Sequence, residues 1–186
     1  TPLRAERGIT LLEVLITIVI LAIGLLGLAG LQSRLQSSEM EAYQRTQALI
    51  LLNDMSNRIA TNRANAAAYV TGASAPLGGT AACPTTTATQ QEIDAGEWCN
   101  ALKGAGERQG ASNVGAMVGG RGCVESIGSN RYLVTVAWQG LTPLTAPPAS
   151  VACGKDLYDG AAGSACTGDL CRRTVTTIVR IGNLES

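Results

Sequence analysis

The sequence predicts an α+β fold, in which a long N-terminal helix packs on an antiparallel sheet built from the C-terminal part of the chain. Three observations lead to this prediction. An almost unbroken aliphatic run extends from Ile9 to Leu31, apolar residues at helical spacing continue it to about Ile59, and alternating strand patterns lie near the C-terminus.

The aliphatic run is apolar enough to cross a membrane. Segment 9–31 contains fifteen Ile, Leu or Val residues and a single charge, Glu13. The large aliphatic residues together favour insertion by about 6 kcal/mol. A carboxylate costs roughly 3 kcal/mol at the bilayer centre and less near its edge, where Glu13 lies. A helix of this length covers about 35 Å, so we expect segment 9–31 to span the membrane.

The flanks of this run predict its orientation. Arg4 and Arg7 precede it, and basic residues favour the cytoplasmic side. All six cysteines, from Cys83 to Cys171, follow it, which is typical of a body that forms disulfides in an oxidising compartment. A cleaved secretory signal is the alternative, but the run is longer than a typical signal core and no good small-x-small cleavage site ends it.

The helix is expected to continue beyond the membrane, over residues 9–62. Its apolar stripe consists of Leu31, Leu35, Ala42, Leu49, Leu52, Met55 and Ile59, which follow one another at helical steps. The first half of this helix has no partner within its own chain, so lipid or other subunits must cover it. The second half should pack on the sheet.

Residues 123–186 are predicted to form the sheet. Alternating residues indicate one strand around Tyr132–Trp138 and another around 174–181. A further strand, Cys123–Ile127, is connected to the first by a turn at Gly128-Ser129-Asn130. Between helix and sheet, residues 63–122 are expected to form an irregular connection rich in Gly, Ala and Thr, which needs disulfides to hold it.

The cysteines allow fifteen pairings, and the sequence alone does not choose among them. Cys83 with Cys99 is the favoured first pair, because it closes a short loop worth roughly 3 kcal/mol in the chain-entropy model. Cys153 with Cys166, and Cys123 with Cys171, would complete the set.

Composition excludes several classes of enzyme. The net charge is zero and His is absent, which removes the usual general base and the usual zinc ligand and gives no basis for nucleic-acid binding. No Cys-x-x-Cys motif is present. Asp156 and Asp159 do not meet a calcium-loop pattern and are interpreted as a solvated turn. We therefore predict no catalytic residues, no metal site and no cofactor.

One short motif is specific. The stretch Arg7-Gly8-Ile9-Thr10-Leu11-Leu12-Glu13 resembles the processing site of type IV prepilins, in which a charged leader ends in Gly and a Glu follows five residues later. The resemblance implies the pilin fold, a leader peptide over residues 1–8, cleavage between Gly8 and Ile9 by a prepilin peptidase, and methylation of the new Ile9 amine. Ile9 stands where the family often has Phe.

The resemblance also gives Glu13 an expected role. With Ile9 as the first residue, Glu13 lies one helical turn from the cationic amine. Family behaviour suggests that it pairs with the amine of a neighbouring subunit. A tolerated charge near the headgroups is the alternative, but intramembrane carboxylates usually have a dedicated partner. We therefore expect Glu13 to align subunits.

Three further segments are similar to PilV-type minor pilins: the Gly-punctuated run 23–32, the strand 132–140 and the terminal strand from Arg172. The resemblance implies a minor pilin that initiates type IV pilus assembly in the inner membrane, with other minor pilins, the major pilin and a tip adhesin as partners. Its body would face the periplasm before assembly and lie near the pilus tip afterwards. Two alternatives remain open, a type II secretion pseudopilin and a membrane-tethered periplasmic enzyme or binding module.

Overall fold

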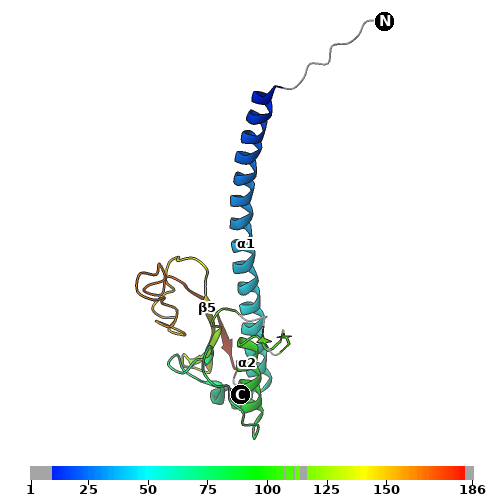
Figure 1. Cartoon of the computed structure of the whole chain (residues 1–186). Coiled ribbons are helices and arrows are strands. Elements are labelled where there is room, and N and C mark those ends of the chain that lie inside the picture. Colours follow the sequence, from blue (N-terminus) through cyan, green and yellow to red (C-terminus); the bar gives the residue numbers. More distant parts are fainter. Residues whose placement is uncertain (1–9, 107, 111, 114–116, 183–186) are drawn as a thin grey trace, which may run out of the picture. The chain divides into compact units, whose positions relative to one another are not determined.

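A computed structural model describes residues 10–106, 108–110, 112–113 and 117–182. The chain divides into two units, residues 1–40 and 41–186. Figure 1 traces the chain from the helix labelled α1 to the strands and loops that follow it. The elements are α1 (Leu11–Thr61), the 3₁₀ helix η1 (Arg63–Tyr69), β1 (Leu77–Gly78), α2 (Gln90–Leu102), β2 (Arg108–Gln109), β3 (Ser112–Asn113), β4 (Arg121–Ser126), β5 (Arg131–Gln139) and β6 (Arg172–Arg180).

The predicted α+β fold class is confirmed. An antiparallel sheet has the strand order β1-β4-β5-β6, and β2 pairs separately with β3. The three main strands match the predicted ones to within about two residues, which is the usual error of strand ends. Ser129 and Asn130, in the predicted turn, both adopt the left-handed conformation that tight hairpins require.

The core of the second unit forms where the last turns of α1 meet one face of the sheet. Ala48, Leu52, Met55 and Ile59 are buried there. The predicted stripe is partly wrong: Ala42 is exposed and Leu49 is 42% exposed, whereas Gln44 and Ala48 are buried. The buried face therefore runs through residues 44, 48, 52, 55 and 59, and Leu49 lies about 100° around the helix from the centre of this face, since each helical step is about 100°.

The connection between helix and sheet is more regular than predicted. Helix α2 lies within it and buries the Trp98 ring completely, and the Trp98 indole donates a hydrogen bond of 2.9 Å to the Leu51 carbonyl. A capping box begins α2, because the Thr89 hydroxyl accepts from the Glu92 amide while the Glu92 carboxylate accepts from the Thr89 amide. This Thr-x-x-Glu pattern is visible in the sequence and predicts a helix start.

Three disulfides join all six cysteines. The pairing of Cys83 with Cys99 is confirmed. The pairings of Cys153 with Cys166 and of Cys123 with Cys171 are wrong, since the structure joins Cys123 to Cys153 and Cys166 to Cys171.

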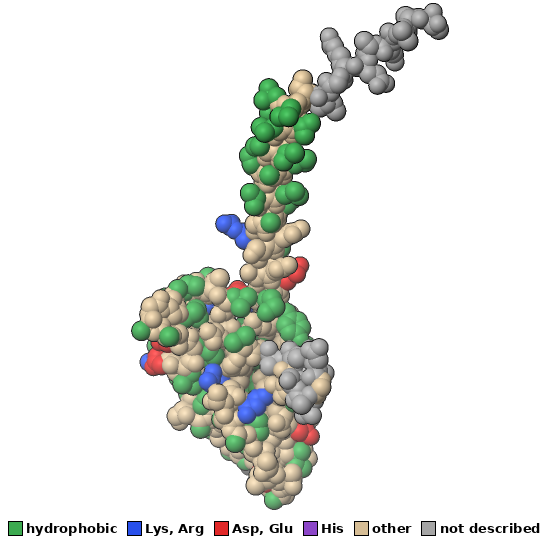
Figure 2. Space-filling view, in the orientation of Figure 1, with side chains coloured by type: hydrophobic (Ala, Val, Ile, Leu, Met, Phe, Trp, Pro, Cys, Tyr) green, Lys and Arg blue, Asp and Glu red, His purple; other side chains and the backbone are tan. Residues whose placement is uncertain are grey.

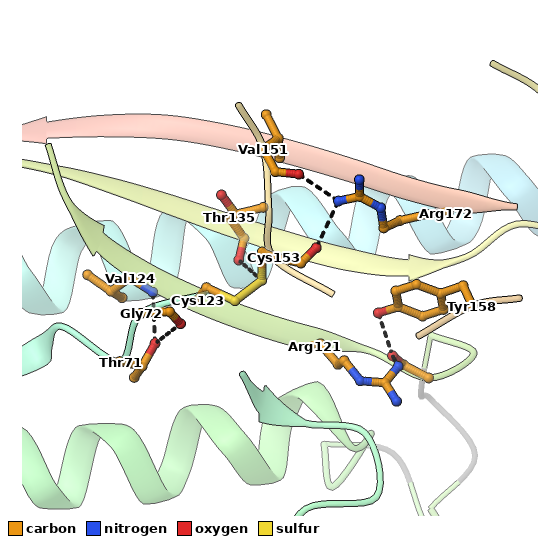
Figure 3. The surroundings of a disulfide bond; sticks show 11 residues. Thr71, Gly72, Arg121, Cys123, Val124, Thr135, Val151, Cys153, Tyr158 and Arg172 are labelled. Atoms are coloured by element: carbon orange, nitrogen blue, oxygen red, sulfur yellow. Dashed lines mark hydrogen bonds between the residues drawn. A yellow bond between two sulfur atoms is a disulfide. The ribbon is translucent and has the colours of Figure 1, made fainter. Parts of the chain in front are cut away.

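Strand register explains the correction. Cys123 lies level with Thr135 of β5 and through it with Thr176 of β6. Cys171 precedes Thr176 by five residues, about 16 Å along the strand direction, far beyond the reach of a disulfide. Cys123 instead meets a loop that crosses the outer face of the sheet, as Figure 3 shows.

This loop, residues 141–171, is fixed to the sheet at one end of β6. The buried Arg172 guanidinium donates to the carbonyls of Val151 and Cys153 at 2.7 and 3.0 Å and pairs with Asp169 at 3.1 Å (Figure 3 shows the two carbonyl bonds). On the same face, the Tyr158 hydroxyl donates to the Gly119 carbonyl, and the Arg121 guanidinium lies over the Tyr158 ring. The loop therefore covers the part of the outer face near Arg172.

Candidate functional site: the N-terminal segment

The first unit presents apolar side chains with nothing packed on them. Every described residue from Thr10 to Met40 is exposed. Figure 2 shows hydrophobic side chains along the visible face of the first turns of α1, with charged side chains visible only toward the end of this part of the helix. The large exposed hydrophobic residues are Leu11, Leu12, Val14, Leu15, Ile16, Ile18, Val19, Ile20, Leu21, Ile23, Leu25, Leu26, Leu28, Leu31, Leu35 and Met40.

By length and composition, α1 contains a stretch that can cross a membrane. A stretch of 18 residues within α1 has a mean hydropathy of 2.8, and none of its residues is buried. Because helix interiors satisfy their own backbone hydrogen bonds, such a segment is stable either in lipid or among other apolar helices. The segment therefore needs an apolar environment that unit 1 itself does not supply.

The start of α1 is capped by Thr10. The Glu13 amide lies 3.0 Å from the Thr10 carbonyl and 3.3 Å from the Thr10 hydroxyl oxygen. Glu13 thus occupies the first turn of the helix, where a negative charge is favoured by the exposed amide groups. Its carboxylate has no ion-pair partner among the described residues.

Glu13 is therefore an acidic group without a described partner at the beginning of an apolar helix. Gly8 and Ile9, the expected cleavage and methylation residues, lie outside the described residues. The structure places Glu13 at the N-terminal end of the helix, which is where a cationic amine at position 9 would lie about one turn away.

Gly24, Gly27 and Gly30 recur every three residues along the same helix. A Cβ atom added to any of them would meet nothing within 4 Å. The chain's own packing therefore does not require these glycines. Small residues of this kind allow another helix to approach closely in an apolar environment.

The second unit contains a polar cluster, centred on the buried Asp94, that the sequence reasoning missed. The Arg58 guanidinium pairs with Asp54, Asp94 and Glu97 at 3.0, 2.8 and 2.7 Å. The Tyr69 hydroxyl donates to Asp94, which is itself buried. The cluster connects α1, η1 and α2. Its bonded side chains lie up to 39 residues apart in the sequence, so no local pattern predicts it.

The electrostatics of this cluster favour an ionised Asp94. Burial alone would raise the pKa of Asp94, but hydrogen bonds from Tyr69, Gln90 and Arg58 outweigh it and lower that pKa below its usual 3.8. Burial and the Asp94 hydrogen bond raise the pKa of Tyr69 to about 12. Each of these side chains has a partner within the cluster, so the cluster joins α1, η1 and α2.

All six cysteines form disulfides, so none is available as a free thiol. Among the described residues, no group of three or more His, Cys, Asp or Glu side chains is placed to hold a metal ion. Asp156 and Asp159 lie in the loop over the sheet. There the Asp169 carboxylate accepts a hydrogen bond from the Asp156 amide, and the Asp159 carboxylate accepts one from the Asp169 amide. These contacts give both residues a role in shaping the loop.

Comparison with known proteins agrees with the N-terminal location of the site. Residues 3–29 match the model of the prokaryotic N-terminal methylation motif. No curated protein and no solved structure matches the chain. The motif is the signal of type IV pilins and pseudopilins, so the match supports a type IV prepilin-like protein that is anchored in a membrane before assembly.

Proposed function

We propose that this protein is a minor pilin that helps to initiate type IV pilus assembly. The methylation motif supports this proposal. It lies at the start of a helix whose described residues up to Met40 are all exposed, so that other apolar molecules can cover them. In the proposed cycle the chain waits in the inner membrane with its body in the periplasm. It then joins other minor pilins in a priming complex, receives the major pilin and carries an adhesin at the pilus tip.

Processing would prepare the segment for assembly. A prepilin peptidase would cleave between Gly8 and Ile9, and the Ile9 amine would then be methylated. A secondary amine remains protonated at neutral pH, so the mature chain would begin with a cation one turn before Glu13. The Glu13 carboxylate would then have a partner of the opposite charge within reach, on its own chain or on the next.

The energetic role of Glu13 would be selection of register. An unpaired charge in an apolar bundle costs several kcal/mol, whereas a paired one costs much less. A subunit that docks one turn too high or too low would leave Glu13 and an amine unpaired. Docking would therefore be favoured only in the register that joins them, and the surrounding aliphatic residues would supply the attraction.

A type II secretion pseudopilin is a second candidate with equal support from the motif. Such a subunit would use the same membrane helix, processing and Glu13 pairing to build a short fibre that moves exoproteins outward. Resemblance to PilV-type segments favours the pilus, and the partners decide between the two. A membrane-tethered enzyme is less well supported, because the match to the methylation motif points to an assembly subunit and the Arg58–Asp94 cluster links structural elements.

Deletion in the native host distinguishes the candidates. We expect loss of sheared surface pili with normal type II exoprotein secretion, and restoration of pili by the intact gene. Lost secretion with normal pili would assign the protein to the secretion pseudopilus instead. Normal pili together with normal secretion would contradict both assembly functions.

A further inference from the structure

The two edges of the main sheet are finished differently. At the edge beside β4, the backbone is occupied over the first and middle parts of the strand. The Val124 carbonyl accepts from the amides of Thr71 and Gly72 at 3.0 Å each, the Val124 amide donates to the Thr71 hydroxyl, and β1 pairs with the beginning of β4. Figure 3 shows the bond from the Val124 amide to the Thr71 hydroxyl, with Gly72 beside it. This edge is closed to another strand.

The opposite edge is β6, and it has no neighbouring strand among the described residues. Its orientation follows from two flanking hydrogen bonds: the Ile181 amide donates to Asn130 and the Gly140 amide donates to Cys171. Both pairs share the register of β5 with β6, in which hydrogen-bonded and non-bonded pairs alternate. The backbone N–H and C=O groups of the odd-numbered residues of β6 therefore point toward β5. The backbone groups of Thr174, Thr176, Ile178 and Arg180 point to the open edge.

Strand β6 has few of the features that usually protect an edge strand from pairing with another chain. The edge strand is nine residues long, and its interior from Thr174 to Val179 is entirely β-branched, without Pro, Gly or a charge. Thr176, Ile178 and Arg180 are exposed, and Ile178 is 47% exposed. None of the four outward amides donates a hydrogen bond to another described residue. The edge from Thr174 to Arg180 is thus free to accept a strand.

Charge indicates what kind of strand fits. Arg131 and Arg180 lie directly opposite each other at one end of the β5–β6 pair. Like charges in this position are destabilising, and neither guanidinium forms an ion pair with a described carboxylate. Arg63, close by, donates to the Gly182 carbonyl. A carboxylate brought to this end of the edge would neutralise the repulsion.

We propose that the open edge of β6 binds an extended segment of a partner subunit as an added β-strand, with an Asp or Glu of that segment beside Arg131 and Arg180. A second copy of this chain fits poorly. Strand β6 contains no Asp or Glu, so pairing two β6 edges brings no carboxylate to Arg180, whether antiparallel about Thr176, which places Arg172 opposite it, or parallel, which places Arg180 beside Arg180. The partner is therefore a different, acidic chain. This inference rests on the proposed assembly function and adds a periplasmic contact to it.

Proline substitution tests the edge selectively. Thr176→Pro removes an outward amide and leaves the ladder to β5 intact, and Pro is tolerated on an edge strand in this position. Thr176→Ala keeps the amide and is the matched control. A photoreactive benzophenone side chain at position 178 of the full chain, expressed in the native host, reports the neighbour, and mass spectrometry maps the cross-linked fragment. Circular dichroism confirms that each variant is folded.

We expect a cross-link to an extended segment that contains Asp or Glu. Thr176→Pro should reduce its yield about tenfold and Thr176→Ala less than about twofold, since only the first removes the backbone donor. Arg180→Glu should reduce the yield roughly tenfold as well, whereas the charge reversal Lys155→Glu, in the exposed loop, should not.

Four outcomes would overturn the inference: no cross-link, a cross-link to a second copy of this chain, a fragment without a carboxylate, or equal yields in the two Thr176 variants. Failure here is distinct from failure of the assembly function. If deletion abolishes fibres but Thr176→Pro restores them fully, only the edge contact is wrong. If deletion leaves pili and secretion unchanged, the assembly function is wrong.

Discussion

Glu13 is the residue on which the assembly account depends most. Glu13→Ala should leave membrane insertion intact or slightly improved, because it removes a carboxylate that costs up to roughly 3 kcal/mol in the bilayer. It should reduce incorporation into fibres by at least about tenfold, because the proposed ion pair with the Ile9 amine could no longer form. Membrane fractionation measures the first effect, and immunoblotting of sheared fibres measures the second.

Glu39→Ala is the matched control for this variant. Glu39 is an exposed carboxylate of the same helix and lies beyond the aliphatic run. Its removal should leave both measurements unchanged. Equal incorporation of the Glu13 and Glu39 variants would show that Glu13 is merely tolerated near the headgroups.

Asp94 makes the stability of the second unit depend on acid. Its pKa is lower in the folded state than the usual 3.8, so its ionised form stabilises the fold above that pH. This contribution is lost as the pH falls through the lowered folded pKa. Denaturant unfolding of the full chain in detergent, followed by the fluorescence of the two buried tryptophans, Trp98 and Trp138, should therefore show falling stability below about pH 4.

Asp94→Asn provides the comparison for this prediction. The amide cannot titrate and leaves Arg58 without one of its charged partners. We expect lower stability of the variant at neutral pH, by about 3 kcal/mol, and a smaller loss on acidification than in the parent chain. An identical pH dependence in the two proteins would show that Asp94 does not contribute to acid sensitivity.

Gly122 tests the packing between β4 and α2. A Cβ atom at this position would overlap the Trp98 ring, which is fully buried. Gly122→Ala should therefore lower the free energy of unfolding by about 1 to 3 kcal/mol. Gly106→Ala is the control, since an added Cβ there meets nothing within 4 Å. Equal stability of the two variants would contradict the placement of Trp98 under β4.

At the scale of elements, the disulfide between Cys123 and Cys153 holds the outer-face loop on the sheet. It joins residues 30 apart, whereas the disulfide between Cys166 and Cys171 joins residues 5 apart. In the chain-entropy model, replacing the first pair by Ser should cost about 3 to 4 kcal/mol and replacing the second about 2 kcal/mol. Thermal and denaturant unfolding of the two double variants measure the difference. The reverse order of stability would contradict the pairing.

The elements also show where sequence reasoning succeeds. Strands β4, β5 and β6 were predictable because alternation and a turn with left-handed residues are local signals. Helix α2 was missed although Thr89 and Glu92 form a recognisable capping box, since the Gly- and Ala-rich composition around it suggested a loop.

Other features could not be read locally. The predicted stripe of α1 includes Leu49, about 100° from the centre of the buried face, because a helix with apolar residues on several sides has no single obvious stripe. Two disulfide pairings were wrong because they depend on strand register, and the Arg58–Asp94 cluster depends on how three elements meet. For the candidate site, the motif around Glu13 was predictable because it is contiguous in the sequence.

At the scale of the whole molecule, the two units have different physical requirements. The second unit has its own core and disulfides, and the described part of the first has only exposed side chains. A chain built in this way gains apolar burial for its N-terminal segment only from lipid or from other subunits. Transfer between these two environments costs little apolar burial, which suits a subunit that leaves a membrane for a fibre.

The central claim is that this chain is processed and assembled as a prepilin-like subunit. Mass spectrometry of the mature N-terminus, on protein purified from the native host, tests it most directly. The account predicts a chain that begins at Ile9 and carries one methyl group on its amine. A mature protein that retains residues 1–8, or that begins at an unmethylated Ile9, would contradict it.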